Sequence, residues 1–431
     1  MKKYLLICLL GLLPLASWSQ VVTNDEPDDE DEIIVTDQEG NEEVIEFPEA
    51  MTYDLDSLMS LYMAKTYLEE DYDCNMRDIN PVYTREEYID RLSRMPCVME
   101  MAYNDVVQKF IDRYSGRLRH SISYMLGASN FYMPIFEEAL EMYQLPLELK
   151  YLPIIESALN PKAVSRVGAT GLWQFMLTTG KQYGLQVNSL VDERRDPQKA
   201  SLAAARYLKD LYKIFGDWNL VIAAYNCGPE NISKAIHRAG GQKDYWQIYP
   251  YLPKETRGYV PAFIAANYIM TYYSQHNICP MATRLPAKSD TVIVNKNLHL
   301  QQVAEVVGIN IDLLRSLNPM YRRDVVPGAT APSVLRLPLT ETTHFIDLQD
   351  SVFSYKSDEL LNRRTEVEVN DDVPTYYHKS KRYIRSKKGR YSRHSKVSRK
   401  RYKASRKRSS ISRKRGTASK KRKSTRRRRR R

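Results

Sequence analysis

One glutamate, Glu156, stands in an otherwise uncharged stretch of the chain, between two isoleucines and the pair Ala158–Leu159. Apolar surroundings disfavour the charged form of a carboxyl group and so raise its pKa. A carboxyl group that keeps its proton near neutral pH can act as a general acid and, once deprotonated, as a general base. The alternative is an ordinary glutamate at the end of a helix, and this stretch alone does not decide between the two.

Three blocks of sequence accompany this glutamate. Glu156-Ser157 is followed by Ser165 and by "GATGLWQFM" at 168–176, in which two glycines permit a tight turn and close backbone approach to a ligand. "AAYNCGP" occupies 223–229, and "ETRGYV" occupies 255–260. Any one block alone would be weak evidence of relationship to a known family, whereas all three in this order are strong evidence.

The elements that carry these blocks are predicted to be helices. In "DPQKASLAAARYLKDLYKIFG", Asp196 is a cap, Pro197 suits the first helical position, apolar residues recur at helical spacing, and Gly216 ends the helix. "DWNLVIAAYNCGPENISKAIHRAGG" predicts two helices separated by a break at Cys-Gly-Pro. No run of alternating strand residues is found, so residues 130–280 are predicted to form a compact helical domain.

The segments before this domain differ from it in composition. Residues 21–50 hold thirteen Asp and Glu and no Lys or Arg. Such a segment buries too little apolar surface to order itself, so we expect residues 20–52 to be a disordered acidic leader. From 53 to 129 apolar residues recur near helical spacing, as in "SLMSLYMAKTYL", and predict a helical arm.

The pattern changes after a proline-containing linker at 280–288. Valine and leucine alternate in "DTVIVNK" and "SVLRLPL", which predict two strands, and two short helices meeting at Gly308 lie between them. This β-α-α-β unit spans residues 289–340 and has the size of a binding module. Residues 375–431 form a low-complexity basic tail that is predicted to be disordered.

The net charge of +13 originates in that tail. From Lys379 onward the chain has 29 Lys and Arg and no Asp or Glu, so the first 378 residues carry 36 basic against 52 acidic residues. A tail of this kind binds polyanions through counterion release and does not read bases. The basic charge therefore says little about the fold.

The first nineteen residues are predicted to be a secretory signal peptide, because two lysines precede a short apolar run that ends in small residues. We therefore expect an exported protein, periplasmic or associated with the envelope. Cys8 lies in the middle of the apolar run, so a lipid anchor is not supported. The remaining cysteines, Cys74, Cys97, Cys227 and Cys279, allow three pairings that the sequence leaves open, and no spacing typical of a metal site is present.

The three blocks resemble the soluble-lytic-transglycosylase family, whose catalytic domain has a goose-lysozyme-like helical fold. The resemblance implies cleavage of the β-1,4 bond between N-acetylmuramic acid and N-acetylglucosamine in peptidoglycan. Glu156 would protonate that bond, and would then take the proton from the muramyl 6-hydroxyl as it closes onto C1. The product is a 1,6-anhydro end, formed without water and without a cofactor or metal.

The resemblance also implies the residues around the acid. Ser165, Gln174 and Met176 would line the substrate groove, Tyr225 and Asn226 would lie near the acid, and Glu255 and Tyr259 would complete the cleft. Trp173 suits packing better than sugar stacking. The chain departs from the family at Leu177, where proline is usual, and it has Cys227 at the variable position of its second block.

The β-α-α-β unit resembles a LysM module, which binds glycans containing N-acetylglucosamine. Asn318 and Gly328 match its landmarks, whereas "NKNLHL" stands where the opening "GDTL" is usual. A spacer domain is the alternative. The predicted fold class is thus mainly α: a lysozyme-like helical catalytic domain with a helical N-terminal arm, plus a small LysM-like module and a disordered basic tail.

Two other functions remain open at this point. The first is a muramidase that hydrolyses the same bond, since most glycosidases use two carboxyl groups; Asp192, Glu193, Asp196 and Asp217 could supply the second, although cap and surface roles explain them more simply. The other is a noncatalytic protein that binds cell wall, anionic envelope polymers or nucleic acid through the tail. The intact blocks around Glu156 favour the enzyme.

Overall fold

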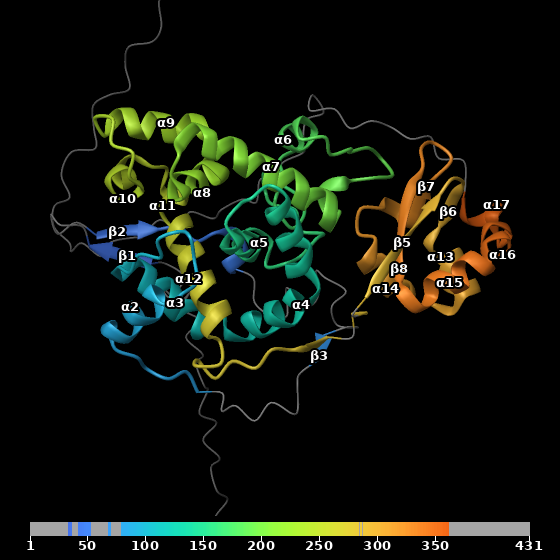
Figure 1. The fold of residues 1–431 in the computed structure, drawn as a ribbon, viewed down its shortest axis with the longest axis horizontal. Helices are drawn as coiled ribbons and strands as arrows, with labels where there is room; N and C mark the ends of the chain where they lie inside the picture. Colours follow the sequence, from blue (N-terminus) through green and yellow to red (C-terminus); the bar gives the residue numbers. More distant parts are fainter. Residues whose placement is uncertain are drawn as a thin grey trace, which may run out of the picture. The chain divides into compact units, whose positions relative to one another are not determined.

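The structure, a computed structural model, describes residues 33–36, 42–52, 68–69, 79–283, 285–286 and 288–361. The predicted signal peptide, most of the predicted helix in "SLMSLYMAKTYL" and the basic tail lie outside the described residues. Within the described residues the chain forms a helical domain followed by a smaller module that contains strands. In Figure 1 the helical domain runs from blue through green to yellow, and the module is orange.

The helical domain is built around one apolar helix. Its α-helices and 3-10 helices (η) are α2 (Arg85–Ser93), α3 (Asp105–Ser115), α4 (Arg119–Met142), η4 (Leu147–Tyr151), α5 (Leu152–Ser157), α6 (Leu177–Gln182), η5 (Glu193–Arg195), α7 (Pro197–Phe215), α8 (Trp218–Cys227), α9 (Pro229–Arg238), α10 (Tyr245–Ile248), η6 (Tyr249–Tyr251), α11 (Lys254–Arg257) and α12 (Tyr259–Tyr272). Helix α12 packs against α3, α4, α5 and α8, and all but its last two residues are buried. A helix that is apolar on every side is stable only inside a core.

The start and end of α7 and the break between α8 and α9 lie where the sequence predicts. Asp196 accepts hydrogen bonds from the backbone N–H groups of Gln198 and Lys199 at the start of α7, and Gly216 ends that helix with a φ of 69°. Helices α8 and α9 are separated at Gly228, which has a φ of 85°. The prediction of a helical domain here is confirmed.

The predicted boundary between arm and domain is not a structural boundary. Helix α4 runs without interruption through residues 129 and 130, and α3 packs against α12. Val107, Phe110 and Ile111 of α3 have no exposed surface and belong to the same hydrophobic core as α12. The described part of the arm is therefore an integral layer of the domain.

The acidic leader is ordered where the structure describes it, which contradicts its prediction as disordered. Strands β1 (Ile33–Thr36) and β2 (Glu42–Ile45) form an antiparallel pair, and the 3-10 helix η2 (Glu49–Thr52) follows. Ile33, Ile45 and Met51 are buried in the main core. The acidic composition of the whole segment conceals these few apolar residues, which are enough to fix the hairpin.

A short antiparallel pair closes the helical domain. Strand β3 (Leu68–Glu69) pairs with β4 (Ala282–Thr283), which follows α12, the last helix of this domain.

Among the described cysteines, Cys279 takes part in a disulfide bond, whereas Cys97 and Cys227 are free thiols.

The module after the linker has more elements than predicted. They are β5 (Ser289–Val294), β6 (Asn297–His299), α13 (Leu300–Val303), the π-helical turn η7 (Ala304–Gly308), α14 (Ile311–Leu317), η8 (Arg322–Asp324), β7 (Val325–Pro327), β8 (Ser333–Pro338), α15 (Leu339–Asp347), α16 (Gln349–Ser354) and α17 (Ser357–Leu360). The two predicted strands are β5 and β8, which pair antiparallel, and β6 pairs with β7. Phe345 and Val352 belong to the module's own core, so the module extends beyond the predicted end at residue 340.

The two LysM-like landmarks have structural roles in this module. The Asn318 side chain exchanges hydrogen bonds of 2.8 Å with the backbone N–H and carbonyl groups of Arg336, which joins the end of α14 to β8. A Cβ on Gly328 would lie 2.5 Å from the carbonyl oxygens of Val294 and Lys296, so the chain needs glycine there for close packing.

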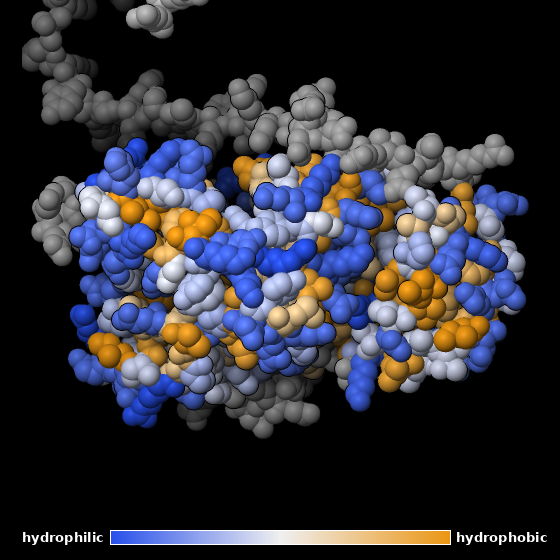
Figure 2. Space-filling view, turned by 45° about the horizontal axis from the view of Figure 1, so that its top comes forward, coloured by the Kyte–Doolittle hydropathy of each residue, from blue (hydrophilic) through white to orange (hydrophobic). Residues whose placement is uncertain are grey.

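The face drawn in Figure 2 is mostly hydrophilic, with apolar residues in small separate patches. Such scattered exposure is usual for a folded protein and marks no particular interface. Within the described ranges, the helices are too short or too polar for any of them to cross a membrane.

Candidate active site

Glu156 lies in the last turn of the short helix α5, and the backbone changes direction directly after it. Ala158 and Leu159 are both fully buried and both left-handed, with φ of 49° and 60°. Residues other than glycine avoid this region at a cost of about 1 to 3 kcal/mol each, and such strain is concentrated at functional sites. The Ser157 hydroxyl donates to the carbonyl of Leu172 at 2.9 Å, which fixes the end of the helix to the glycine-containing turn.

The carboxyl group of Glu156 receives a hydrogen bond from Tyr259 at the start of α12. The pKa of Glu156 is raised to about 7: burial is the main cause, the hydrogen bond from Tyr259 opposes it, and the negative charge of Glu255 adds to it. Burial also raises the pKa of Tyr259 well above its ordinary value, so its hydroxyl remains a donor. A raised pKa of this size lets Glu156 keep its proton much closer to neutral pH than an ordinary glutamate does.

The turn after α5 is held by hydrogen bonds of its own. Thr170 and Phe175 exchange two backbone hydrogen bonds, of 3.0 and 3.1 Å. Ser165 accepts from the N–H of Ala169 at 3.0 Å, and the side chain of Gln174, a residue with a φ of 48°, donates to the carbonyl of Gly171 at 2.7 Å. These bonds of Ser165 and Gln174 stay inside the turn, so the structure gives both residues a role in its shape.

The other predicted site residues fall into two groups. The pKa of Tyr225 is raised well above its ordinary value, mainly by burial and secondly by the nearby charge of Glu156. The Tyr225 hydroxyl donates to the carbonyl of Trp173 at 2.8 Å. Asn226 accepts a hydrogen bond of 2.9 Å from Thr256, which joins the second block to the third. Met176 and Glu255 are exposed, the former to 45%.

Trp173 packs in the core, as predicted. It is 1% exposed, and its indole N–H donates to the Ser201 hydroxyl at 2.9 Å. It therefore offers no face to a sugar.

The four candidates for a second carboxylate are occupied elsewhere. Asp196 and Asp217 cap α7 and α8, as predicted. Glu193 pairs with Lys199 and accepts from the N–H of Gln186 at 2.7 Å. Asp192 is fully buried in ion pairs with arginines. Glu255 is instead the carboxylate whose charge acts on Glu156.

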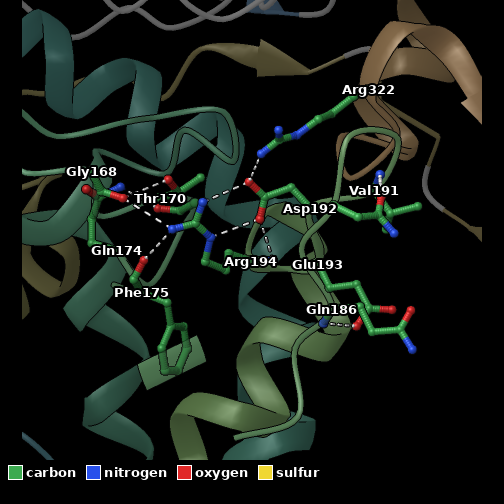
Figure 3. Close-up of polar contacts among 12 residues, drawn as sticks. Gly168, Thr170, Gln174, Phe175, Gln186, Val191, Asp192, Glu193, Arg194 and Arg322 are labelled. Atoms are coloured by element: carbon green, nitrogen blue, oxygen red, sulfur yellow. Dashed lines mark hydrogen bonds and ion pairs between the residues drawn. The ribbon is translucent and has the colours of Figure 1, made fainter. Parts of the chain in front are cut away.

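An arginine that the sequence does not single out holds the turn in place (Figure 3). Arg194 is 7% exposed, and its guanidinium group donates at 3.2 Å to the carbonyls of Gly168 and Phe175, near the two ends of the turn. Its other nitrogens donate to Asp192 at 2.9 Å. "DERRDP" shows three acids and two arginines, but which of the arginines faces the turn depends on the folded backbone.

The third block also has roles that the sequence does not reveal. Arg257 forms an ion pair with Glu43 of β2 and donates to the carbonyls of Leu252 and Pro250 at 3.1 and 2.6 Å. A Cβ on Gly258 would lie 2.5 Å from the carbonyl oxygen of Glu46, so the hairpin packs directly on this glycine. Arg257 and Gly258 dock the N-terminal hairpin, while the next residue reaches the acid.

This geometry agrees with a comparison against known protein families. Residues 133–248, which include α5, the turn and the second block, match the family described as transglycosylase SLT domain. The chain contains an SLT domain. The third block lies outside the matched range, but α11 and α12, which carry it, pack against helices of that range and supply Tyr259. The hairpin also lies outside the range and packs against α3 and α11. The module matches the LysM-like domain of lytic transglycosylase D over residues 288–353, which agrees with its extension beyond residue 340.

Several curated relatives of the chain are named as lytic murein transglycosylases. The chain is 33% identical over 219 residues to membrane-bound lytic murein transglycosylase D of Escherichia coli, an alignment that covers 49% of this chain and 46% of that protein. It is also 33% identical over 124 residues to the soluble lytic murein transglycosylase of Escherichia coli, covering 27% of this chain and 19% of the relative. The chain thus spans about half or less of the length of these relatives.

A solved structure of the 70 kDa soluble lytic transglycosylase of Escherichia coli is similar over 35% of this chain and 26% of its own, at 28% identity. The TM-score of that match, 0.30, is too low to support a conclusion about the fold.

Proposed function

We propose that the protein is a peptidoglycan lytic transglycosylase that cleaves the β-1,4 bond between N-acetylmuramic acid and N-acetylglucosamine and leaves 1,6-anhydromuramic ends. The observation that carries the proposal is the buried carboxyl group of Glu156, which has a pKa of about 7. Glu156 lies within the residues that match the SLT domain. Those curated relatives that are named lytic murein transglycosylases support the same activity.

The proposed mechanism needs one acid that becomes a base. Protonated Glu156 gives its proton to the glycosidic oxygen as the bond to C1 breaks. The resulting carboxylate takes the proton of the muramyl 6-hydroxyl, whose oxygen attacks C1 and closes the anhydro ring. Tyr259 donates to the same carboxyl group and so stabilises the charged form after the first step. The glutamate ends the cycle protonated, with no cofactor or metal consumed.

Hydrolysis of the same bond is the second candidate, and one observation favours it. Glu255 is exposed and its charge acts on Glu156, so it could activate a water molecule as the second carboxylate of a muramidase. The chemistry of the newly formed chain end separates the two enzymes.

A digestion separates either enzyme from a noncatalytic wall-binding protein. The full chain should release soluble muropeptides from purified peptidoglycan sacculi within the time scale of ordinary enzyme turnover. Sacculi that sediment with the protein and release no fragments would contradict the proposal.

We also propose peptidoglycan glycan strands as the ligand of the LysM-like module, since its match is to a module of lytic transglycosylases.

The proposal that the protein is exported to the periplasm or envelope rests on residues 1–19, which lie outside the described residues. The basic tail lies outside them too, and its 29 Lys and Arg support retention on anionic polymers of the envelope or on nucleic acid.

Removal of the tail should separate retention from turnover. A chain ending at Asp372 should keep its turnover on soluble glycan fragments and lose salt-sensitive binding to sacculi or to heparin-like polyanions. The attraction weakens with salt because the Debye length falls from about 10 Å at 0.1 M to about 3 Å at 1 M. Co-sedimentation of both chains at these two salt concentrations measures the difference, and equal pelleting at both would show that the tail is passive.

A further inference from the structure

The buried carboxylate of Asp192 joins the C-terminal module to the turn beside the catalytic acid. One oxygen accepts from the side chain of Arg194 at 2.9 Å, and the other accepts from Arg194 at 2.9 Å and from Arg322 of the module at 2.7 Å (Figure 3). Asp192 has no exposed surface. Burial alone would raise its pKa, but hydrogen bonds and charge from the two arginines lower it, so the carboxylate stays ionised.

The backbone makes the same connection. Asp192 donates its N–H to the carbonyl of Met320 at 2.9 Å, and Arg322 donates its N–H to the carbonyl of Leu190 at 2.7 Å. Val191 and Tyr321 form the antiparallel bridge between these bonds. Leu190 and Val191 are buried in the hydrophobic core of the module. The segment before α7 is therefore paired with the module on one side and with the turn on the other.

The turn also contacts α5, the helix that carries Glu156. Arg194 binds the carbonyls of Gly168 and Phe175, and between them Leu172 accepts from Ser157, the neighbour of Glu156. Bidentate bonds between arginine and carboxylate fix the plane of the guanidinium group, so the position of Asp192 determines where Arg194 points. Arg194 and Arg322 both donate to the one carboxylate of Asp192, which is buried.

We propose that Arg322 is a positioning residue for catalysis: by holding Asp192 it orients Arg194, and it thereby makes the shape of the turn beside Glu156 depend on the docked module. The inference rests on the proposed glycan cleavage at Glu156, but its structural part stands without it. The module then does more than tether the enzyme to the wall, because its docking favours the catalytically competent turn.

The test compares Arg322→Ala with Arg323→Ala in the full chain. Arg323 is the adjacent arginine and is exposed, so it is a control for the loss of one positive charge in the same segment. On soluble glycan fragments, Arg322→Ala should lower kcat/KM on the order of 10-fold, within the usual range of coupling between sites, mainly by raising KM. Arg322→Lys should recover part of the loss, since its ammonium group keeps the charge with a single-point contact.

Amide hydrogen exchange provides a readout that does not require activity. The N–H groups of Thr170 and Phe175, which bond to each other's carbonyls, should exchange several-fold faster in Arg322→Ala and at the wild-type rate in Arg323→Ala. Unchanged exchange in the turn would overturn the inference, and so would a loss of activity confined to intact sacculi. If neither the wild type nor any variant cleaves glycan, the proposed function fails. The hydrogen-exchange comparison still tests whether Arg322 affects the turn.

Discussion

Replacement of Glu156 by glutamine should lower the rate of glycan cleavage by about 10²- to 10⁴-fold, the range assigned to general acid–base catalysis. Glutamine keeps the size of the side chain and can still accept the hydrogen bond from Tyr259, but it cannot give up and regain a proton. Glu141→Gln, an exposed change on α4, is the matched control and should leave the rate unchanged. If Glu156→Gln and Glu141→Gln lost the same fraction of the cleavage rate while both stayed folded, the catalytic acid would lie elsewhere.

The pH dependence follows from the same carboxyl group. The wild-type rate should fall about tenfold per pH unit above the pKa of Glu156, near 7, because only the protonated form can start the reaction.

The same raised pKa also affects stability. Between the ordinary value of 4.5 and about 7 the folded state holds a proton that the unfolded state has lost, so the stability of the wild type falls as pH rises through this window. Glu156→Gln should therefore be at least as stable as the wild type at pH 8, which also confirms that the inactive variant is folded.

Gly171→Ala should destabilise the helical domain strongly. A Cβ at this position would lie 1.9 Å from the carbonyl oxygen of Arg194, and the backbone has a φ of 90° that alanine avoids. Conformational strain of about 1 to 3 kcal/mol adds to an overpacking cost of about 1 to 3 kcal/mol. The melting temperature should fall on the order of 10 °C.

Gly168→Ala separates the two contributions. Gly168 has a φ of 88°, but a Cβ there would meet no atom within 4 Å. This variant should therefore lose only the conformational part, and its melting temperature should fall roughly half as far. Equal losses in Gly168→Ala and Gly171→Ala would contradict the close packing of the turn on Arg194.

The features that could be predicted from the sequence are those encoded by neighbouring residues. The cap, first-position proline and terminal glycine of α7 lie in one segment, and the structure places all three as expected. The apolar setting of Glu156 likewise depends on its immediate neighbours, Ile154, Ile155, Ala158 and Leu159, which are all buried. Local signals of this kind do not require knowledge of the tertiary fold.

The features that could not be predicted depend on partners far apart in the chain. Asp192 and Arg322 are 130 residues apart, and Tyr259 meets Glu156 across 103 residues. The prediction of a disordered acidic leader is wrong for the described residues, because composition averages over a whole segment, whereas burial of Ile33 and Ile45 is decided by the surface that receives them. That surface includes Gly258, which exists as a docking point only in the folded chain.

The central claim is that the 6-hydroxyl of the substrate, and not water, attacks the sugar after Glu156 gives up its proton. Mass spectrometry of muropeptides released in ¹⁸O-labelled water tests it directly. The account predicts products that end in 1,6-anhydromuramic acid, lighter by one water than reducing ends, with no ¹⁸O incorporated. Reducing ends that each carry one ¹⁸O would contradict it and would identify the protein as a hydrolytic muramidase.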